Sequence, residues 1–306
     1  MNPEIGVLDF SIQRPRQSGL DAIQSTERLA CEAEKLGFAR YWVAEHHEED
    51  SCHCSPEVMV GMLASRTNRI RLGAGGVLLR YRDPYLVAQA FNLLSALHPE
   101  RIDLGIARGR IGGEARQYFE ASDTTDQTLE SKCMLLSRLF RSNSSSRVLR
   151  PVTTPPQMWM LGGKGAALAA VRDKCSLCLD RFYQELPDTA IRDILMKYDD
   201  DFVSTAAIPT PQSGVAIAGI CAESDHRALQ FAADAPHTGF PIGIVKLAVV
   251  GSPGRWMDYL SAAIHRWGTH RFMVLAASNN ESVKYETLSL LGEAFNLADS
   301  CRNMIS

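Results

Sequence analysis

Short apolar runs alternate with longer amphipathic segments along the chain, and this alternation limits the possible folds more than any other feature. The runs have the length of buried strands, and the longer segments carry apolar residues at helical spacing. The predicted strands span 5–10, 39–45, 70–79, 101–107, 157–161, 176–182, 214–222 and 270–277. The predicted helices span 19–36, 55–67, 83–97, 126–140, 164–173, 188–198, 223–233, 252–268 and 281–296.

Eight strand-helix units in one chain predict an α/β fold, the parallel (β/α)8 TIM barrel. A doubly wound open sheet is the alternative. The serine-rich stretch 141–156 is predicted to be a surface loop, because the alternation resumes beyond it. We therefore expect a single barrel domain over residues 1–306, a length that α/β barrels reach as one domain.

Composition argues against several classes of partner. A formal net charge of −3 gives no reason to expect binding to nucleic acid or to an anionic membrane. No apolar run is long enough to span a bilayer, and the first ten residues show no secretory signal. The expected compartment is therefore the cytoplasm, where the eight cysteines would stay reduced.

Unusual residues lie at or near the carboxyl ends of four of the predicted strands. They are Glu45-His46-His47, Gly75-Gly76, Arg108-Gly109 and Gly162-Gly163-Lys164-Gly165. In a barrel of this type the chemistry lies at the carboxyl ends of the strands, so these residues are expected around one mouth. This shared location carries more information than any one of the motifs.

The turn at 162–165 is suited to a phosphate. Glycines let the backbone approach a ligand, and the helix that follows offers free N–H groups and the positive end of its dipole. Lys164 and Arg108 would add positive charge. The alternatives are an ordinary glycine-rich turn and a surface arginine, and the full P-loop pattern is absent.

The glycine pair Gly75-Gly76 predicts a bulge or the close approach of a ligand, with tight barrel packing as the alternative. His46 and His47 are adjacent, so only one of them is expected to face the mouth. A histidine there can act as a general acid or base. The alternative is a histidine that bonds to the loop backbone.

The cysteines and histidines of this region offer an alternative, a metal site. Zinc accepts the ligand types of His46, His47, Cys52, His53 and Cys54. The spacing between the two cysteines is too tight and no second pair follows, so we expect no metal. Cys175 and Cys178 have the spacing of a redox motif, but they fall in a predicted strand and are expected in the core.

The sequence resembles the bacterial luciferase-like flavin-dependent monooxygenases. The resemblance rests on "RYWVAEHH" (40–47), "SPEVMVGMLASRTNRIRLGAGGVLL" (55–79), "VAQAFNLLSALHPERIDLGIARG" (87–109), "WMLGGKGAALAA" (159–170) and "GSPGRWMDYLSAAIHRWGTHRFMV" (251–274). It implies reduced FMN as cofactor, with the phosphate near Arg108, Gly109 and the Gly162-Gly163-Lys164 turn. It also implies the isoalloxazine ring over Gly75-Gly76, where relatives often carry a cis peptide. His46 matches the family's catalytic histidine, Glu45 would orient its loop, and Glu114 lies near the position of an acidic residue that flanks the flavin.

The expected activity is a two-component monooxygenase reaction. Reduced FMN would react with O2 to a flavin C4a-hydroperoxide, which transfers one oxygen atom to a small or medium apolar molecule. A separate NAD(P)H-flavin reductase would supply the FMNH2, since all eight units are used for the barrel. The resemblance also implies a homodimer. Ala107 stands in place of a cysteine found in light-emitting relatives, which argues against light emission. The alternatives are an F420-dependent hydride-transfer enzyme and a flavin-binding protein without catalysis.

Overall fold

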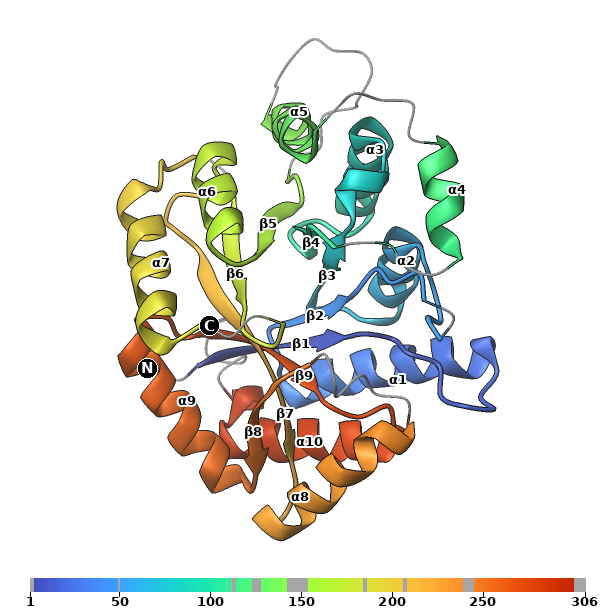
Figure 1. Cartoon of the computed structure of the whole chain (residues 1–306), viewed down its shortest axis with the longest axis vertical. Coiled ribbons are helices and arrows are strands. Elements are labelled where there is room, and N and C mark those ends of the chain that lie inside the picture. Colours follow the sequence, from blue (N-terminus) through green and yellow to red (C-terminus); the bar gives the residue numbers. More distant parts are fainter. Residues whose placement is uncertain are drawn as a thin grey trace.

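The chain folds around one parallel sheet whose strands lie inside a layer of helices (Figure 1). The computed structural model describes residues 3–48, 50–109, 111, 114–122, 128–141, 154–183, 186–205, 208–238 and 245–299. The strands are β1 (Glu4–Asp9), β2 (Arg40–Val43), β3 (Arg71–Val77), β4 (Ile102–Ile106), β5 (Gln157–Gly162), β6 (Ser176–Asp180), β7 (Ser213–Cys221), β8 (Leu247–Gly251) and β9 (Arg271–Ala276).

The helices follow the strands in alternation. They are α1 (Gly19–Leu36), α2 (Pro56–Arg66), α3 (Pro84–Leu97), α4 (Ala115–Ser122), α5 (Leu129–Arg141), α6 (Lys164–Asp173), α7 (Asp188–Asp201), α8 (Asp225–Asp234), α9 (Pro253–Trp267) and α10 (Glu281–Ala294). Short 3-10 helices span Leu79–Tyr81 and Ala235–Thr238. None of the helices in the described ranges is long and apolar enough to cross a membrane.

Eight of these strands close a barrel, which confirms the predicted (β/α)8 fold. The closed order is β1-β2-β3-β4-β5-β6-β7-β9, with β9 paired back to β1, and every pair is parallel. The alternative of a doubly wound open sheet is therefore excluded. The predicted eighth strand, 270–277, corresponds to β9, and β8 was not predicted.

Strand β8 lies outside the closed ring and shares one edge of β7 with β6. The amino-terminal half of β7 pairs with β6, up to Ala216 opposite Asp180, and the carboxyl-terminal half pairs with β8 from Ala218 onward. Between the two, the Lys246 N–H donates to the Phe182 carbonyl at 2.9 Å. The β6 strand therefore leaves the wall of the barrel where β8 begins.

Local sequence signals explain where several helices begin and end. The Asp83 side chain accepts from the N–H groups of Tyr85 and Leu86 and caps α3, and Gly37 ends α1 with a left-handed φ of 87°. Helix α4 was not predicted. The predicted helix 126–140 begins at Leu129 in the described structure.

An ionic layer fills the amino end of the barrel and positions a tryptophan above it. The buried carboxylate of Asp103 accepts from Arg40 Nη1 at 2.7 Å, Arg71 Nη2 at 2.6 Å and Trp42 Nε1 at 2.9 Å. Burial alone would raise the pKa of Asp103, but Arg71 and Arg40 hold it below its usual value. The Trp42 ring packs edge-on against Trp159 at 5.3 Å and so forms part of the floor of the site described below.

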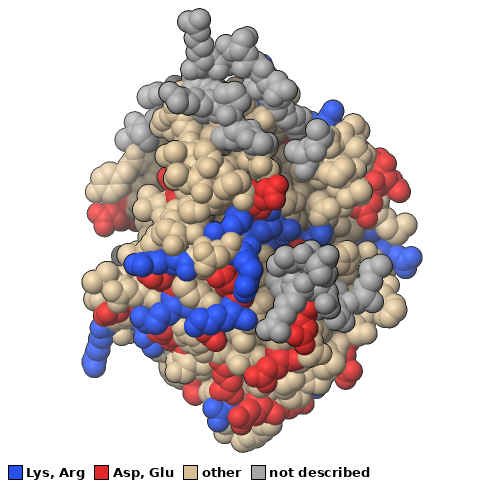
Figure 2. Space-filling view, turned by 180° about the vertical axis from the view of Figure 1, so that it is seen from behind, with Lys and Arg blue, Asp and Glu red and all other residues tan. Residues whose placement is uncertain are grey.

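The face seen from behind carries side chains of both charge signs (Figure 2). Lys and Arg side chains gather in a band across this face, with Asp and Glu side chains between and below them (Figure 2). This mixture accords with the net charge of −3.

Candidate active site

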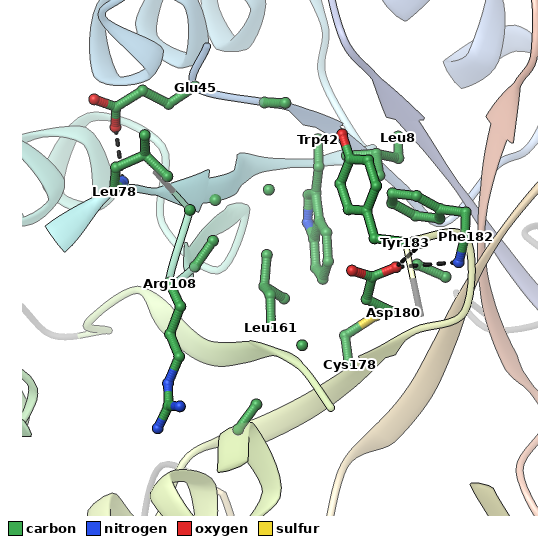
Figure 3. A pocket seen from close by; sticks show the side chains of 18 of the residues that line it. Leu8, Trp42, Glu45, Leu78, Arg108, Leu161, Cys178, Asp180, Phe182 and Tyr183 are labelled. Carbon is green, nitrogen blue, oxygen red and sulfur yellow. Dashed lines mark hydrogen bonds between the residues drawn. The ribbon is translucent and has the colours of Figure 1, made fainter. Parts of the chain in front are cut away.

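A pocket of about 1160 Å³ opens at the carboxyl ends of the strands (Figure 3). Its lining comes from strands β1, β2, β3, β5, β6 and β7 and from the segments that follow β1 to β6. Every predicted site residue except Glu114 borders it: Glu45, His46, Gly75, Gly76, Arg108, Gly109, Gly162, Gly163 and Lys164. Glu114 is exposed just before α4 and is not brought to this lining. The fold therefore brings these nine predicted residues to one pocket, and their catalytic and binding roles remain predictions.

The turn from β5 into α6 faces the guanidinium of Arg108. Gly162 adopts a φ of 136°, which favours glycine, and Gly163 caps the helix without a side chain. The Gly163 carbonyl accepts from the N–H groups of Ala166 and Ala167. A Cβ built on Gly165 would lie 3.1 Å from both Nη1 and Nη2 of Arg108. A cation therefore lies beside the positive end of a helix dipole, which is a suitable arrangement for a phosphate.

The glycine pair in β3 combines a bulge with tight packing against the neighbouring strand, the two features that the sequence left open as alternatives. The Gly75–Gly76 peptide bond is cis, and the register between β3 and β4 shifts between Ala74 and Val77, as a bulge does. A Cβ on Gly76 would lie 2.8 Å from the Gly105 carbonyl oxygen, so packing alone requires glycine there. Both residues also border the pocket, and they present bare backbone to it.

Glu45 is fully buried and ties β2 to the end of β3. Its carboxylate accepts from the Leu78 N–H at 2.9 Å and from Arg82 Nη1 at 3.1 Å, and its Oε1 lies 2.9 Å from His47 Nε2. Burial opposes its ionisation, but the hydrogen bond from His47 and the charge of Arg82 outweigh burial and lower the pKa of Glu45. Glu45 therefore acts on the shape of the loop, in line with the orienting role implied by the resemblance.

The two adjacent histidines have different partners. His47 is almost buried, bonded to Glu45 and packed edge-on against Phe119 of α4 at 4.8 Å. The His46 ring packs edge-on against Phe10 at 4.9 Å, and its Nδ1 lies 3.5 Å from the Glu48 carboxylate. The hydrogen bond to His46 lowers the pKa of Glu48 to about 2. Both rings border the pocket, but His46 is the more exposed of the two, with 25% of its side chain accessible.

A mostly apolar wall, which the sequence did not predict, forms the other side of the pocket. It consists of Leu8, Phe10, Trp42, Leu161, Cys178, Phe182 and Tyr183. The Phe10 ring contacts Phe182 edge-on at 5.9 Å and stacks with Tyr183 at 6.1 Å. One carboxylate, that of Asp180, lies in this wall (Figure 3). Asp180 is a polar residue at the carboxyl end of an apolar strand. The same pattern identified the other candidate residues, so it could also have identified Asp180.

The alternative metal site receives no geometric support. Among the described residues, no group of three or more His, Cys, Asp and Glu side chains is arranged to hold a metal ion. His53 is largely buried, and burial lowers its pKa to about 4. Cys175 and Cys178 are buried in the core, as predicted, and burial raises the pKa of the Cys178 thiol to about 12.

Comparison with known proteins agrees with this architecture. The uncharacterized protein YwcH of Bacillus subtilis (strain 168) is 28% identical over 332 residues, which cover 95% of this chain and 98% of that protein. N-acetyl-S-alkylcysteine monooxygenase of the same organism is 38% identical over 169 residues, 52% of this chain and 51% of that protein. The crystal structure of apo-MsnO8 superposes with a TM-score of 0.84 at 27% identity, over 97% of this chain and 98% of that one.

The family model of luciferase-like monooxygenases matches residues 4–175, which include β1 to β5 and the turn that faces Arg108. This match spans more than half of the 306 residues. The chain belongs to the luciferase-like monooxygenase family.

Proposed function

We propose that this protein is a two-component monooxygenase that takes reduced FMN from a separate NAD(P)H-flavin reductase and transfers one atom of O2 to a small or medium apolar substrate. The observation that carries the proposal is the position of the Arg108 guanidinium, 3.1 Å from where a Cβ on Gly165 would lie at the start of α6. This cation and the helix start would serve as a phosphate site, and they border the same pocket as the bare backbone of Gly75-Gly76 and the ring of His46.

The residues present fit a phosphorylated flavin. Arg108 and the free N–H groups of Lys164 and Gly165 would bind the phosphate, and Lys164, which is exposed at the rim, would add charge. Gly75 and Gly76 leave a flat wall for a planar ring. Reduced FMN would supply the electrons and the reaction with oxygen when bound.

The chain itself would hold the proton and exclude water. His46 has one ring nitrogen near Glu48 and a second nitrogen available to donate or accept a proton in the pocket. The aromatic side chains of Phe10, Phe182 and Tyr183 cover the pocket beside it and keep water from the reacting atoms. Glu45 and His47 fix the loop on which His46 stands.

An anaerobic titration tests this assignment. Reduced FMN should bind more tightly than reduced riboflavin, because only FMN offers a phosphate to Arg108. Arg108→Ala should weaken FMN roughly 10- to 100-fold and leave riboflavin unchanged, since one charge-assisted contact contributes about 1.5–3 kcal/mol. Equal affinity of the wild-type protein for the two flavins would refute the phosphate site.

The reaction with O2 then distinguishes FMN-dependent monooxygenation from F420-dependent hydride transfer. After a pulse of O2, the bound reduced FMN should reoxidise with kinetics distinct from those of free FMN, and His46→Ala should alter that rate without altering FMN affinity. Tight binding of F420 together with weak binding of FMN would favour hydride transfer instead. Unchanged reoxidation in His46→Ala would indicate a protein that binds flavin without catalysis.

A further inference from the structure

The apolar wall of the pocket contains one carboxylate that the proposed reaction does not use. Asp180 is the last residue of β6 and borders the pocket. Its Oδ1 accepts from the N–H groups of Phe182 at 3.1 Å and Tyr183 at 2.9 Å. Among the residues that the structure describes, no cation pairs with Asp180 and no hydrogen bond reaches its Oδ2.

The position of this carboxylate follows from the topology. Asp180 is the last β6 residue to pair with β7, and two residues later the Phe182 carbonyl accepts from the Lys246 N–H just before β8. The two bonds to Oδ1 close the turn between these points and fix the carboxyl group. Figure 3 shows the other oxygen directed into the pocket, below Tyr183 and beside Leu161 and Cys178.

The surroundings of the free oxygen are apolar. The side chains of Trp42, Leu161, Phe182 and Tyr183 border the same space. Asp180 is only partly buried, so Oδ2 can be reached from the pocket, and a ligand donor that enters there would find an acceptor. Burial also raises the pKa of Asp180, against the opposing effect of the hydrogen bonds from the Tyr183 and Phe182 N–H groups.

We propose that Asp180 is a specificity-determining residue, which selects an apolar, ring-containing substrate that carries a hydroxyl or amine donor and disfavours substrates with an anionic group at this end. Oδ2 would accept the hydrogen bond from that donor, while the aromatic side chains pack against the ring. The cationic turn near Arg108 then serves the cofactor phosphate, and the acidic end serves the substrate. This inference rests on the proposed function, because it assigns the space beside Asp180 to substrate.

Matched small probes test the assignment by binding alone. The probes are p-cresol, 4-methylanisole, which lacks the donor, and 4-methylbenzoate, which is anionic. Calorimetric titration uses the full-length protein with and without oxidised FMN. We expect the wild-type protein to bind p-cresol at least roughly tenfold more tightly than 4-methylanisole, and 4-methylbenzoate most weakly.

The informative variant is Asp180→Asn, whose amide oxygen can still accept from the Phe182 and Tyr183 N–H groups. Its amide nitrogen would donate toward the pocket, so the preference for p-cresol should fall below about threefold and 4-methylbenzoate should gain affinity. Asp199→Asn, on the exposed face of α7 and outside the pocket lining, removes the same charge and should keep the wild-type preference. If Asp180→Asn does not fold, Asp180→Ser replaces it, because a hydroxyl also accepts from a following turn.

The outcomes separate this inference from the proposed function. The same probe preference in wild-type protein and Asp180→Asn would overturn the inference, and so would the failure of all three probes to bind. A change in FMN affinity without a change in probe preference would show that Asp180 contacts the cofactor, which overturns the inference but leaves the monooxygenase proposal in place. Failure of FMN to bind, with the probe preference intact in flavin-free protein, would refute only the monooxygenase proposal.

Discussion

Replacing Glu45 by alanine should destabilise the protein strongly, because one buried carboxylate holds three groups. The change leaves the buried Leu78 N–H without its acceptor and removes a partner from both His47 and Arg82. Loss of one partner from a buried charge network costs about 3–5 kcal/mol. Arg82 is 19% exposed and keeps Glu57, so the lower part of that range is expected.

The expected change in melting temperature follows from the length of the chain. An unfolding entropy of about 2.1 cal/mol/K per residue gives about 0.6 kcal/mol/K for 306 residues. A loss of about 3–5 kcal/mol therefore lowers Tm by roughly 5–8 °C in a calorimetric scan. Glu57→Gln is the matched control, since the Glu57 side chain is 22% exposed and its carboxylate pairs with Arg82; it should cost about 1 kcal/mol or less.

The pH dependence gives a second check on the same carboxylate. The pKa of Glu45 lies below its ordinary value of 4.5 in the folded protein. Its contribution to stability is therefore fully present above about pH 4.5 and is lost as the pH falls through the lowered folded-state pKa. The difference between wild-type protein and Glu45→Ala should narrow only in that acidic range. A Tm within 1 °C of wild type at pH 7 would refute the network, as would a difference that widens on acidification.

Two further predictions test individual positions. Gly165→Ala should displace the Arg108 guanidinium, which lies 3.1 Å from the new Cβ, and weaken FMN binding severalfold in a fluorescence titration; Gly254→Ala in α9, which meets nothing within 4 Å, should leave FMN affinity unchanged. His53→Leu should reduce the acid sensitivity of the fold. Burial lowers the pKa of His53 to about 4 from 6.5, so its protonation favours the unfolded chain and stability is lost as the pH falls from 6.5 toward 4. Urea unfolding at pH 7 and pH 5 measures this slope, and an equal loss of stability in variant and wild type would contradict it.

The sequence predicted the barrel because strand and helix periodicity are local properties. It missed β8 because Leu247–Gly251 is five residues long, follows a stretch rich in Pro and Gly, and pairs only with half of β7. Strand β8 is an extra strand outside the eight strand-helix units, so the alternation of strands and helices does not predict it. Its existence depends on an edge of β7 that β6 leaves free, which is a property of the closed barrel.

The site was predictable where a polar or glycine residue directly follows a strand. His46, Arg108 and the 162–165 turn have this signature and reach one pocket. Arg82 lacks it, because it stands after a 3-10 turn and reaches Glu45 only through the folded loop. The aromatic wall was missed because Phe10 and Tyr183 are far apart in sequence and meet only when the barrel closes.

The exchange of partners along β7 has a consequence for how substrate preference can change. Since β8 takes up the hydrogen bonds of upper β7, the segment after Asp180 is released from the sheet and can bend across the opening with Phe182 and Tyr183. The backbone hydrogen bonds between β7 and β8 do not depend on the conformation of the segment after Asp180. Insertions or replacements there can therefore reshape the entrance without breaking the ring of strands that carries the chemistry.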